Sequence, residues 1–189
     1  MTEVPIGPLY AGFWPRLGAI FIDLLVGAPV IPLSIWAQHR YRLFDVYRAV
    51  PMIILSAVYS IYLVARFGGT PGKLLMGLRI TELDGRPVTP RAAIVRGFPE
   101  FILSTLITVA LCVPLLSMSD NEYAALVANF SHRYRYLRTN APNWYRPVDV
   151  INTAWVWGEL LVLLTNRKRR ALHDFLAGTV VIRKRRPLQ

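Results

Sequence analysis

Cysteine and charged residues are both scarce in this 189-residue sequence, and each scarcity excludes classes of protein. The one cysteine, Cys112, allows no intramolecular disulfide and no cysteine-ligated metal cluster. Charged residues make up 17% of the chain, whereas soluble domains usually carry about a quarter. Asp and Glu number 11 against 22 Lys and Arg, which gives a formal net charge of +11. This composition argues against a disordered chain, a coiled coil or an ordinary cytosolic domain.

Hydrophobic residues are abundant instead, at 54% of the chain, and the mean hydropathy is +0.38. A spanning helix needs about 20 mainly apolar residues to cross a bilayer core about 30 Å thick. Four runs approach this length, at residues 17–37, 49–65, 98–118 and 148–165. They could be buried helices of a soluble protein, but so short a chain offers too little polar surface to cover them. We therefore expect an all-α membrane protein built as a four-helix transmembrane bundle.

The distribution of Lys and Arg predicts the orientation of the chain. The segments before the first run, between the second and third, and after the fourth hold fifteen of these residues, and the other two segments hold seven. Cytoplasmic segments carry the excess of positive charge. Both termini and the central segment are therefore predicted to be cytoplasmic. We interpret the basic charge as a topology signal and a contact with anionic headgroups, not as a nucleic-acid site.

The central segment contains several turn and cap signals. Residues 78–89 have the form of a short hairpin with Asp84-Gly85 at its turn. Thr89 and Pro90 suit the N-cap and first position of a helix, which we expect to lie at the membrane interface and lead into the third span. Just before them, Gly69, Pro71, Gly72 and Lys73 form a tight turn that looks like a phosphate loop. Leu74 stands where that loop needs Ser or Thr, so we reject nucleotide binding.

Two other local features leave alternatives open. The loop at residues 119–147 mixes arginines with aromatic residues, which could bind RNA or lie on headgroups, and residues 123–130 could form a short helix in it. Pro29 and Pro32 should kink the first span. A broken helix often marks a transport site, but it is also tolerated as a plain kink.

Three separated motifs resemble the RDD family of small bacterial membrane proteins. They are GFWPRLGAIFID at residues 12–23, GTPGK at 69–73 followed by GLRI at 77–80, Gly85 and Arg96, and RALHDFLAGTVV at 170–181. By this resemblance the arginine and two aspartates that name the family are Arg16, Asp23 and Asp174, and Gly178 belongs to the last motif. The resemblance covers about residues 10–183 and leaves a basic tail at 184–189. It implies a polytopic inner-membrane protein, and transport or cation/proton exchange has been suggested for some members.

The carboxylates predicted to lie inside the membrane are the candidate functional groups, because a charge there must be paired, protonated or hydrated. Asp23 lies nearly two helical turns after Arg16 and on the same face. It could form an ion-pair network, bind a proton or cation, or contact headgroups. Glu159 lies near the middle of the fourth run. It could be a neutral, hydrogen-bonded side chain or a proton carrier that works with Asp23. We hypothesise that Arg16, Asp23, Arg96 and Asp174 form one charge network near the inner leaflet.

These observations give two hypotheses for the function. The first is transport or cation/proton exchange through Asp23 and Glu159, which would require a homo-oligomer because four spans are few for a conduit. The alternative is a non-transporting accessory or scaffold protein that binds a partner membrane protein. A transporter should expose its polar residues to one wet cavity, whereas a scaffold should seal them in pairs. We expect no enzymatic activity, no cofactor and no metal site, since no catalytic or ligand spacing is visible.

Overall fold

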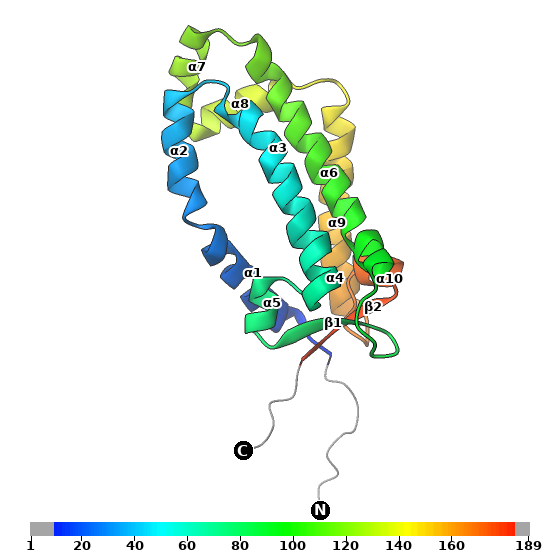
Figure 1. Ribbon diagram of the computed structural model, residues 1–189. Helices are drawn as coiled ribbons and strands as arrows, with labels where there is room; N and C mark the ends of the chain where they lie inside the picture. Colours follow the sequence, from blue (N-terminus) through cyan, green and yellow to red (C-terminus); the bar gives the residue numbers. More distant parts are fainter. Residues whose placement is uncertain (1–9, 184–189) are drawn as a thin grey trace, which may run out of the picture. The chain divides into compact units, whose positions relative to one another are not determined.

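The computed structural model describes residues 10–183, so the basic tail expected at residues 184–189 lies outside the described residues. The elements are α1 (Phe13–Gly27), α2 (Val30–Arg40), α3 (Phe44–Ala57), the π-helix η1 (Val58–Tyr62), α4 (Leu63–Phe67), α5 (Pro71–Leu75), β1 (Leu78–Glu82), α6 (Pro90–Ser117), α7 (Asp120–Val127), α8 (Phe130–Thr139), α9 (Tyr145–Thr165), α10 (Leu172–Leu176) and β2 (Thr179–Arg183) (Figure 1). The chain divides into two compact units, which are described separately. Unit 1 holds residues up to 24, 59–97 and from 157 onward, and unit 2 holds residues 25–58 and 98–156.

Within the described residues, three helical segments are long and apolar enough to cross a membrane. They are Phe44–Leu75, Pro90–Ser117 and Tyr145–Thr165, and the bent pair α1 and α2 would make a fourth. The expectation of an all-α membrane protein is confirmed. Helices are the natural spanning form because they satisfy every backbone hydrogen bond internally, without water.

The predicted kink of the first span is confirmed as a complete break. Helix α1 ends at Gly27 and α2 begins at Val30, with Pro29 at its N-cap. Pro32 falls in the first turn of α2, where a helical backbone N–H has no partner within the helix, so this second proline costs no hydrogen bond.

Unit 1 contains a two-stranded antiparallel sheet. The strand pairing within a local hairpin that we expected at residues 78–89 is wrong. Strand β1 pairs with β2 from the C-terminal part of the chain, and Ile80 lies opposite Val181. The Asp84-Gly85 turn is present, but only Thr81 and Pro87 bridge across it. The reason is burial: Leu78 and Ile80 are each 1% exposed and Val181 is fully buried, so the apolar β2 covers β1 better than the polar residues after the turn could.

The helix expected before the third span is present, but it is continuous with that span and not a separate element. Helix α6 runs without a break from Pro90 to Ser117, over 28 residues. The predicted start is present, because the Ala92 N–H donates to the Thr89 hydroxyl at 3.3 Å. Pro99 lies inside this helix and does not end it.

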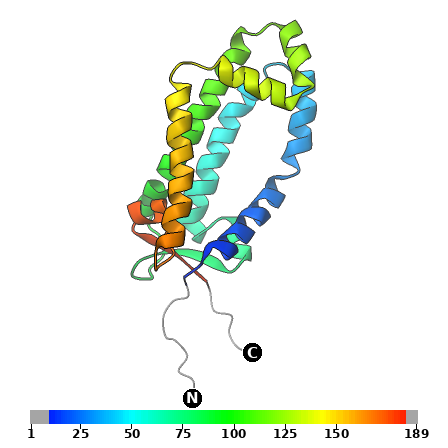
Figure 2. The same ribbon diagram turned by 180° about the vertical axis from the view of Figure 1, so that it is seen from behind.

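Unit 2 contains α2 and α3, joined by residues 41–43, and the two helices of the 119–147 loop. Helix α7 begins with a capping box in which Ser119 and Glu122 each accept from the other's backbone N–H. The predicted helix at residues 123–130 is therefore present but starts earlier, and a second helix, α8, follows it. Figure 2 shows α8 lying crosswise to α2. Leu115, Met118, Tyr123 and Leu137 form the core that packs this loop.

Candidate functional site

The most deeply buried carboxylate of unit 1 is Asp174, which is fully buried at the third position of α10. Its Oδ2 accepts from Nη1 of Arg16 at 3.0 Å, and its Oδ1 accepts from Nη1 of Arg96. Both arginines are themselves buried, with 8% and 6% of their surfaces exposed. One carboxylate thus joins α1, α6 and α10. Ion pairs with this little water contact are rigid, since breaking one would leave a charge without compensation.

Further hydrogen bonds hold this network in place. Thr179 donates to Asp174 Oδ1 at 3.1 Å and accepts from Arg96 at 3.0 Å. Arg170 donates to the backbone carbonyls of Asp174 and Thr179, at 2.8 and 3.0 Å. Arg16 Nη2 donates to the carbonyl of Arg169 at 2.6 Å. Arg169 has φ of 51°, a left-handed conformation that is uncommon for a residue other than glycine, so this carbonyl is held in a strained position.

Glu159 lies beside this network and contacts His173 of α10. His173 Nδ1 and Glu159 Oε1 are hydrogen-bonded, and His173 Nε2 lies 3.8 Å from Asp174 Oδ1. Burial, followed by the charges of Arg96, Lys73 and Arg16, lowers the pKa of His173 well below its ordinary value. The neutral imidazole is therefore the favoured form, and its Nδ1 shares a hydrogen bond with Glu159 Oε1. The side chains of this pair are 17% and 24% exposed, so it is less sealed than the Asp174 network.

Asp23 lies in a separate group of unit 1 with neutral donors. Its Oδ1 accepts from the Tyr59 hydroxyl and from the Gly72 N–H, both at 2.6 Å, and its Oδ2 accepts from the Thr70 hydroxyl at 2.6 Å. Thr70 is also the N-cap of α5 and accepts from the Lys73 N–H. Asp23 therefore fixes the start of α5 against α1. The hypothesis of one network containing all four named residues is wrong for Asp23, because these three donors already occupy its carboxylate.

The turn at residues 69–73 allows the close contact between the start of α5 and α1. Gly72 approaches α1 so closely that a Cβ there would lie 2.1 Å from the Ala19 carbonyl oxygen and 2.7 Å from the Asp23 carboxylate. Pro71 occupies the first turn of α5, and Gly69 is buried just before it. Gly178, with φ of 65°, makes the left-handed turn from α10 into β2. These motif residues therefore have structural roles.

A cluster in unit 2 was missed by sequence reasoning. The Asp45 carboxylate accepts from Arg48 Nη2 at 2.9 Å and from Gln38 Nε2 at 2.9 Å, and it lies 3.3 Å from Arg133 Nη1. Asp45 lies between the first two apolar runs of the sequence, and Arg133 comes from the 119–147 loop. The only sequence signal was the Asp45/Arg48 spacing of three residues, which suits a helical ion pair.

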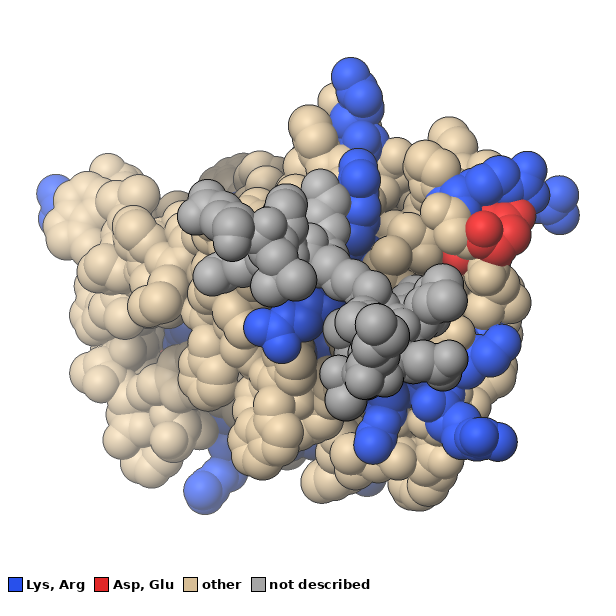
Figure 3. All heavy atoms as spheres, turned by 90° about the horizontal axis from the view of Figure 1, so that it is seen from below, with Lys and Arg blue, Asp and Glu red and all other residues tan. Residues whose placement is uncertain are grey.

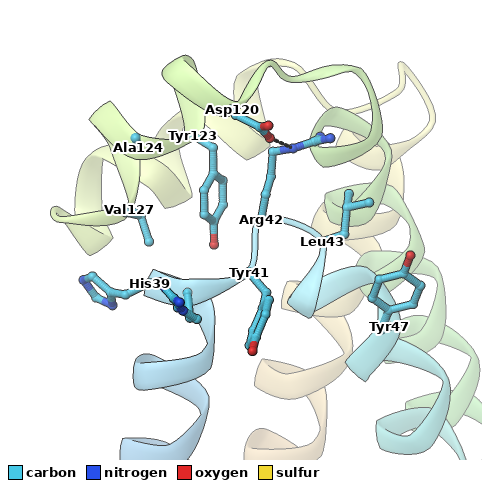
Figure 4. A pocket seen from close by; sticks show the side chains of 10 residues that line it. His39, Tyr41, Arg42, Leu43, Tyr47, Asp120, Tyr123, Ala124 and Val127 are labelled. Carbon is cyan, nitrogen blue, oxygen red and sulfur yellow. Dashed lines mark hydrogen bonds and ion pairs between the residues drawn. The ribbon is translucent and has the colours of Figure 1, made fainter.

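A cavity of about 540 Å³ also lies in unit 2, between the end of α2, the start of α3 and helix α7 (Figure 4). Arg42 crosses its wall and donates to Asp120 at 2.5 Å and to the carbonyls of Leu115 and Met118. The Tyr123 hydroxyl donates to the Gln38 carbonyl at 2.8 Å. The Arg42 and Tyr123 side chains therefore have their hydrogen-bond partners within the protein. These bonds hold the 119–147 loop against α2 and the connection to α3.

The end of unit 1 at which β1 and β2 lie is strongly basic. Seen from below, Lys and Arg side chains predominate over Asp and Glu on the face that Figure 3 shows. Such a face suits contact with anionic headgroups.

Comparison with models of known protein families identifies the family of the chain. A sequence model of the RDD family matches residues 10–178, which is most of the chain. No curated protein matches the sequence. The matched range contains Arg16, Asp23, Arg96, Glu159 and Asp174.

Proposed function

The chain belongs to the RDD family of integral membrane proteins, and from this premise we propose that it is a non-enzymatic accessory protein that binds another membrane protein within the bilayer. The observation that supports this proposal is that the buried carboxylate Asp174 is fully paired with donors of the same chain. Asp174 is saturated by Arg16, Arg96, Thr179 and the Ala171 N–H. A carrier carboxylate must exchange its partners during each cycle, whereas these groups tie distant segments together.

The spanning helices offer a surface for such a partner. The most apolar windows of the three long helical segments are only 6%, 17% and 6% buried within the chain. On α9 an exposed stripe repeats at alternating steps of four and three residues, and it consists of Val150, Ala154, Trp157, Leu161 and Leu164. This spacing is that of the contact positions in paired helices.

Cross-linking tests this proposal. A photo-reactive amino acid at Trp157, on the stripe, should form a product with one discrete membrane protein in native membranes. The same group at Leu25 of α1, which is 72% exposed but off the stripe, should not. Ala154→Trp should abolish the product without changing the amount of folded protein. Equal products from both positions would contradict a specific partner, and a product of twice the chain's own mass would identify a homo-oligomer instead.

Cation/proton exchange is the second candidate, favoured by one observation. Glu159 and His173 form a polar contact whose side chains are 24% and 17% exposed, and His173 Nε2 is buried without a hydrogen-bond partner among the described residues. A proton could therefore be held at this pair. Pulses of Na⁺, K⁺ and Li⁺ on proteoliposomes containing a pH dye distinguish the candidates. The accessory function predicts no flux above empty liposomes. Flux that Glu159→Gln abolishes and Asp84→Asn, at an exposed carboxylate, leaves intact would establish exchange.

We also propose that both termini and the central segment face the cytoplasm of a cell whose inner membrane contains the protein. The excess of Lys and Arg in these segments supports it. With Cys112 replaced by serine, a cysteine at Gly85 should resist a membrane-impermeant maleimide on intact cells. A cysteine at Asn140 should react. Labelling at Gly85 but not at Asn140 would show that the topology is the opposite of the proposed one.

A further inference from the structure

Unit 2 contains a second cavity, of about 420 Å³, between α2 and α3 and beside the start of α8. Its lining is mostly apolar and includes Val30, Ile31, Met52 and Leu55. Gln38 and Arg48 contribute the principal polar groups. The residues that carry the proposed function lie elsewhere, so this cavity requires its own explanation.

The cavity has a polar end and an apolar end. Helices α2 and α3 are joined by residues 41–43, so Gln38 and Arg48 both lie within two helical turns of the connection. Val30 and Leu55 lie farther along their helices. At 1.5 Å per residue, the eight residues from Val30 to Gln38 span about 12 Å. This polarity matches an amphiphile with its head near the connection and its tail between the helices.

The polar end carries uncompensated positive charge. Arg48 and Arg133 share the single carboxylate of Asp45, at 2.9 and 3.3 Å, while Gln38 also donates to it. The cluster therefore has a formal charge of +1. Moreover, Arg48 Nε is buried and has no hydrogen-bond partner within residues 10–183. Arg48 is paired with Asp45 through Nη2, and its side chain is 34% exposed. An anion in the cavity would satisfy its Nε donor and balance the excess positive charge of the cluster.

We propose that this cavity binds one acyl chain of an anionic phospholipid, whose phosphate pairs with Arg48. Charge complementarity identifies the occupant. The apolar lining fits the acyl chain, and the phosphate supplies the acceptor that Arg48 Nε lacks. A zwitterionic lipid would bring its own cation beside two arginines. An apolar helix of a second copy would leave the charge uncompensated.

Thermal unfolding of the purified full-length protein in detergent tests the proposal. Phosphatidylglycerol should raise the unfolding temperature, and phosphatidylcholine with the same acyl chains should raise it much less. Inorganic phosphate should have no effect, because it lacks the chain that fills the apolar end. Oleate has an acyl chain with a carboxylate head, so it distinguishes a fatty acid from a phospholipid as the occupant. A shift with oleate alone would overturn the assignment to a phospholipid.

Variants test whether phosphatidylglycerol raises the unfolding temperature by binding in this cavity. Arg48→Gln should weaken the apparent affinity for phosphatidylglycerol about ten-fold, the loss expected for one charge-assisted contact. Because this change also touches Asp45, Leu55→Trp provides a second variant that fills the apolar end and keeps the arginine. It should also abolish the shift. Arg40→Gln, at an exposed arginine that does not line this cavity, should leave it unchanged.

Three results would overturn the proposal. The first is equal stabilisation by the two phospholipids. The second is a preference for phosphatidylglycerol that survives in both Arg48→Gln and Leu55→Trp. The third is a change of oligomeric state in Leu55→Trp, measured by light scattering, since it would show that a second copy of the chain covers this cavity.

Discussion

Arg16 and Asp174 are 158 positions apart in the sequence, and Arg16 Nη1 donates to Asp174 Oδ2 at 3.0 Å. This bond joins the first spanning helix to α10, beside the only sheet of the described chain. Arg96 reaches the other oxygen of the same carboxylate. The three residues therefore act as one structural unit, and removal of any one changes the environment of the other two.

Removal of the shared carboxylate should be strongly destabilising. Asp174→Asn keeps the side-chain shape but leaves two buried guanidinium groups without a counter-charge. We expect the free energy of unfolding to fall by about 3–5 kcal/mol, the loss typical of breaking a buried ion pair. Denaturant titration in detergent micelles would measure it. Asp84→Asn, at an exposed carboxylate bonded to Arg86, is the control and should have no measurable effect. Equal losses in both variants would contradict the burial argument.

Gly72→Ala should disturb the contact between α5 and α1. The added Cβ would lie 2.1 Å from the Ala19 carbonyl oxygen, so the two segments must separate. Overpacking of this kind typically costs about 1–3 kcal/mol, and the fixed backbone here favours the upper end. Gly27→Ala is the matched control, because a Cβ at Gly27 meets no atom within 4 Å. Thermal unfolding of both variants would measure the difference, and similar transitions would refute the close approach.

Tyr59→Phe should weaken the anchoring of Asp23. It removes one of the neutral donors, with Thr70 and Gly72, from which the Asp23 carboxylate accepts. A hydrogen bond to a charged group contributes about 1.5–3 kcal/mol, so we expect a loss in that range. Tyr62→Phe, in the same π-helix but 56% exposed, should be close to neutral. The same denaturant titration would compare the two, and an equal effect at both tyrosines would count against the Asp23 bond.

His173 should make stability depend on pH. Its pKa in the folded protein is well below the 6.5 of the free side chain, mainly because it is buried and then because three cations lie nearby. The unfolded chain thus binds a proton at a pH where the folded protein does not. The free energy of unfolding has its full value above pH 6.5 and falls below it, by up to about 1.4 kcal/mol per pH unit.

Unfolding measured between pH 7.5 and 5 would check this dependence. His173→Asn retains an N–H donor toward Glu159 but cannot be protonated, so its stability should vary less over this range. His132→Asn removes an exposed histidine from α8 and should leave the slope as it is in the native protein. The prediction fails if His173→Asn and the native protein have the same slope.

The sequence predicted best those features that depend on residues close together in the chain. Apolar runs predicted the spanning helices, because a run of about 20 apolar residues has few other stable placements. Thr89 and Pro90 predicted the start of α6, and Pro29 predicted the break between α1 and α2. Each of these signals acts within a few residues of itself.

Interactions between distant segments were harder to predict. The partner of β1 is β2, about 100 residues later, and the nearby Asp84-Gly85 turn favoured a local hairpin instead. Asp23 illustrates a different difficulty. Its spacing from Arg16 suggested an ion pair, but the close approach of Gly72 brings neutral donors to the carboxylate first. Backbone N–H groups and hydroxyls carry no charge pattern that a sequence reveals.

The late position of Asp174 also has a consequence for biosynthesis. Arg16 and Arg96 leave the ribosome long before the carboxylate that neutralises them. At about 5–20 residues per second, the 158 residues between Arg16 and Asp174 take roughly 8–30 s to synthesise. Arg16 throughout that interval, and Arg96 during the last 78 residues of it, must stay in water, at the headgroups or with an assembly factor. The final fold of unit 1 is therefore reached only after Asp174 has been made.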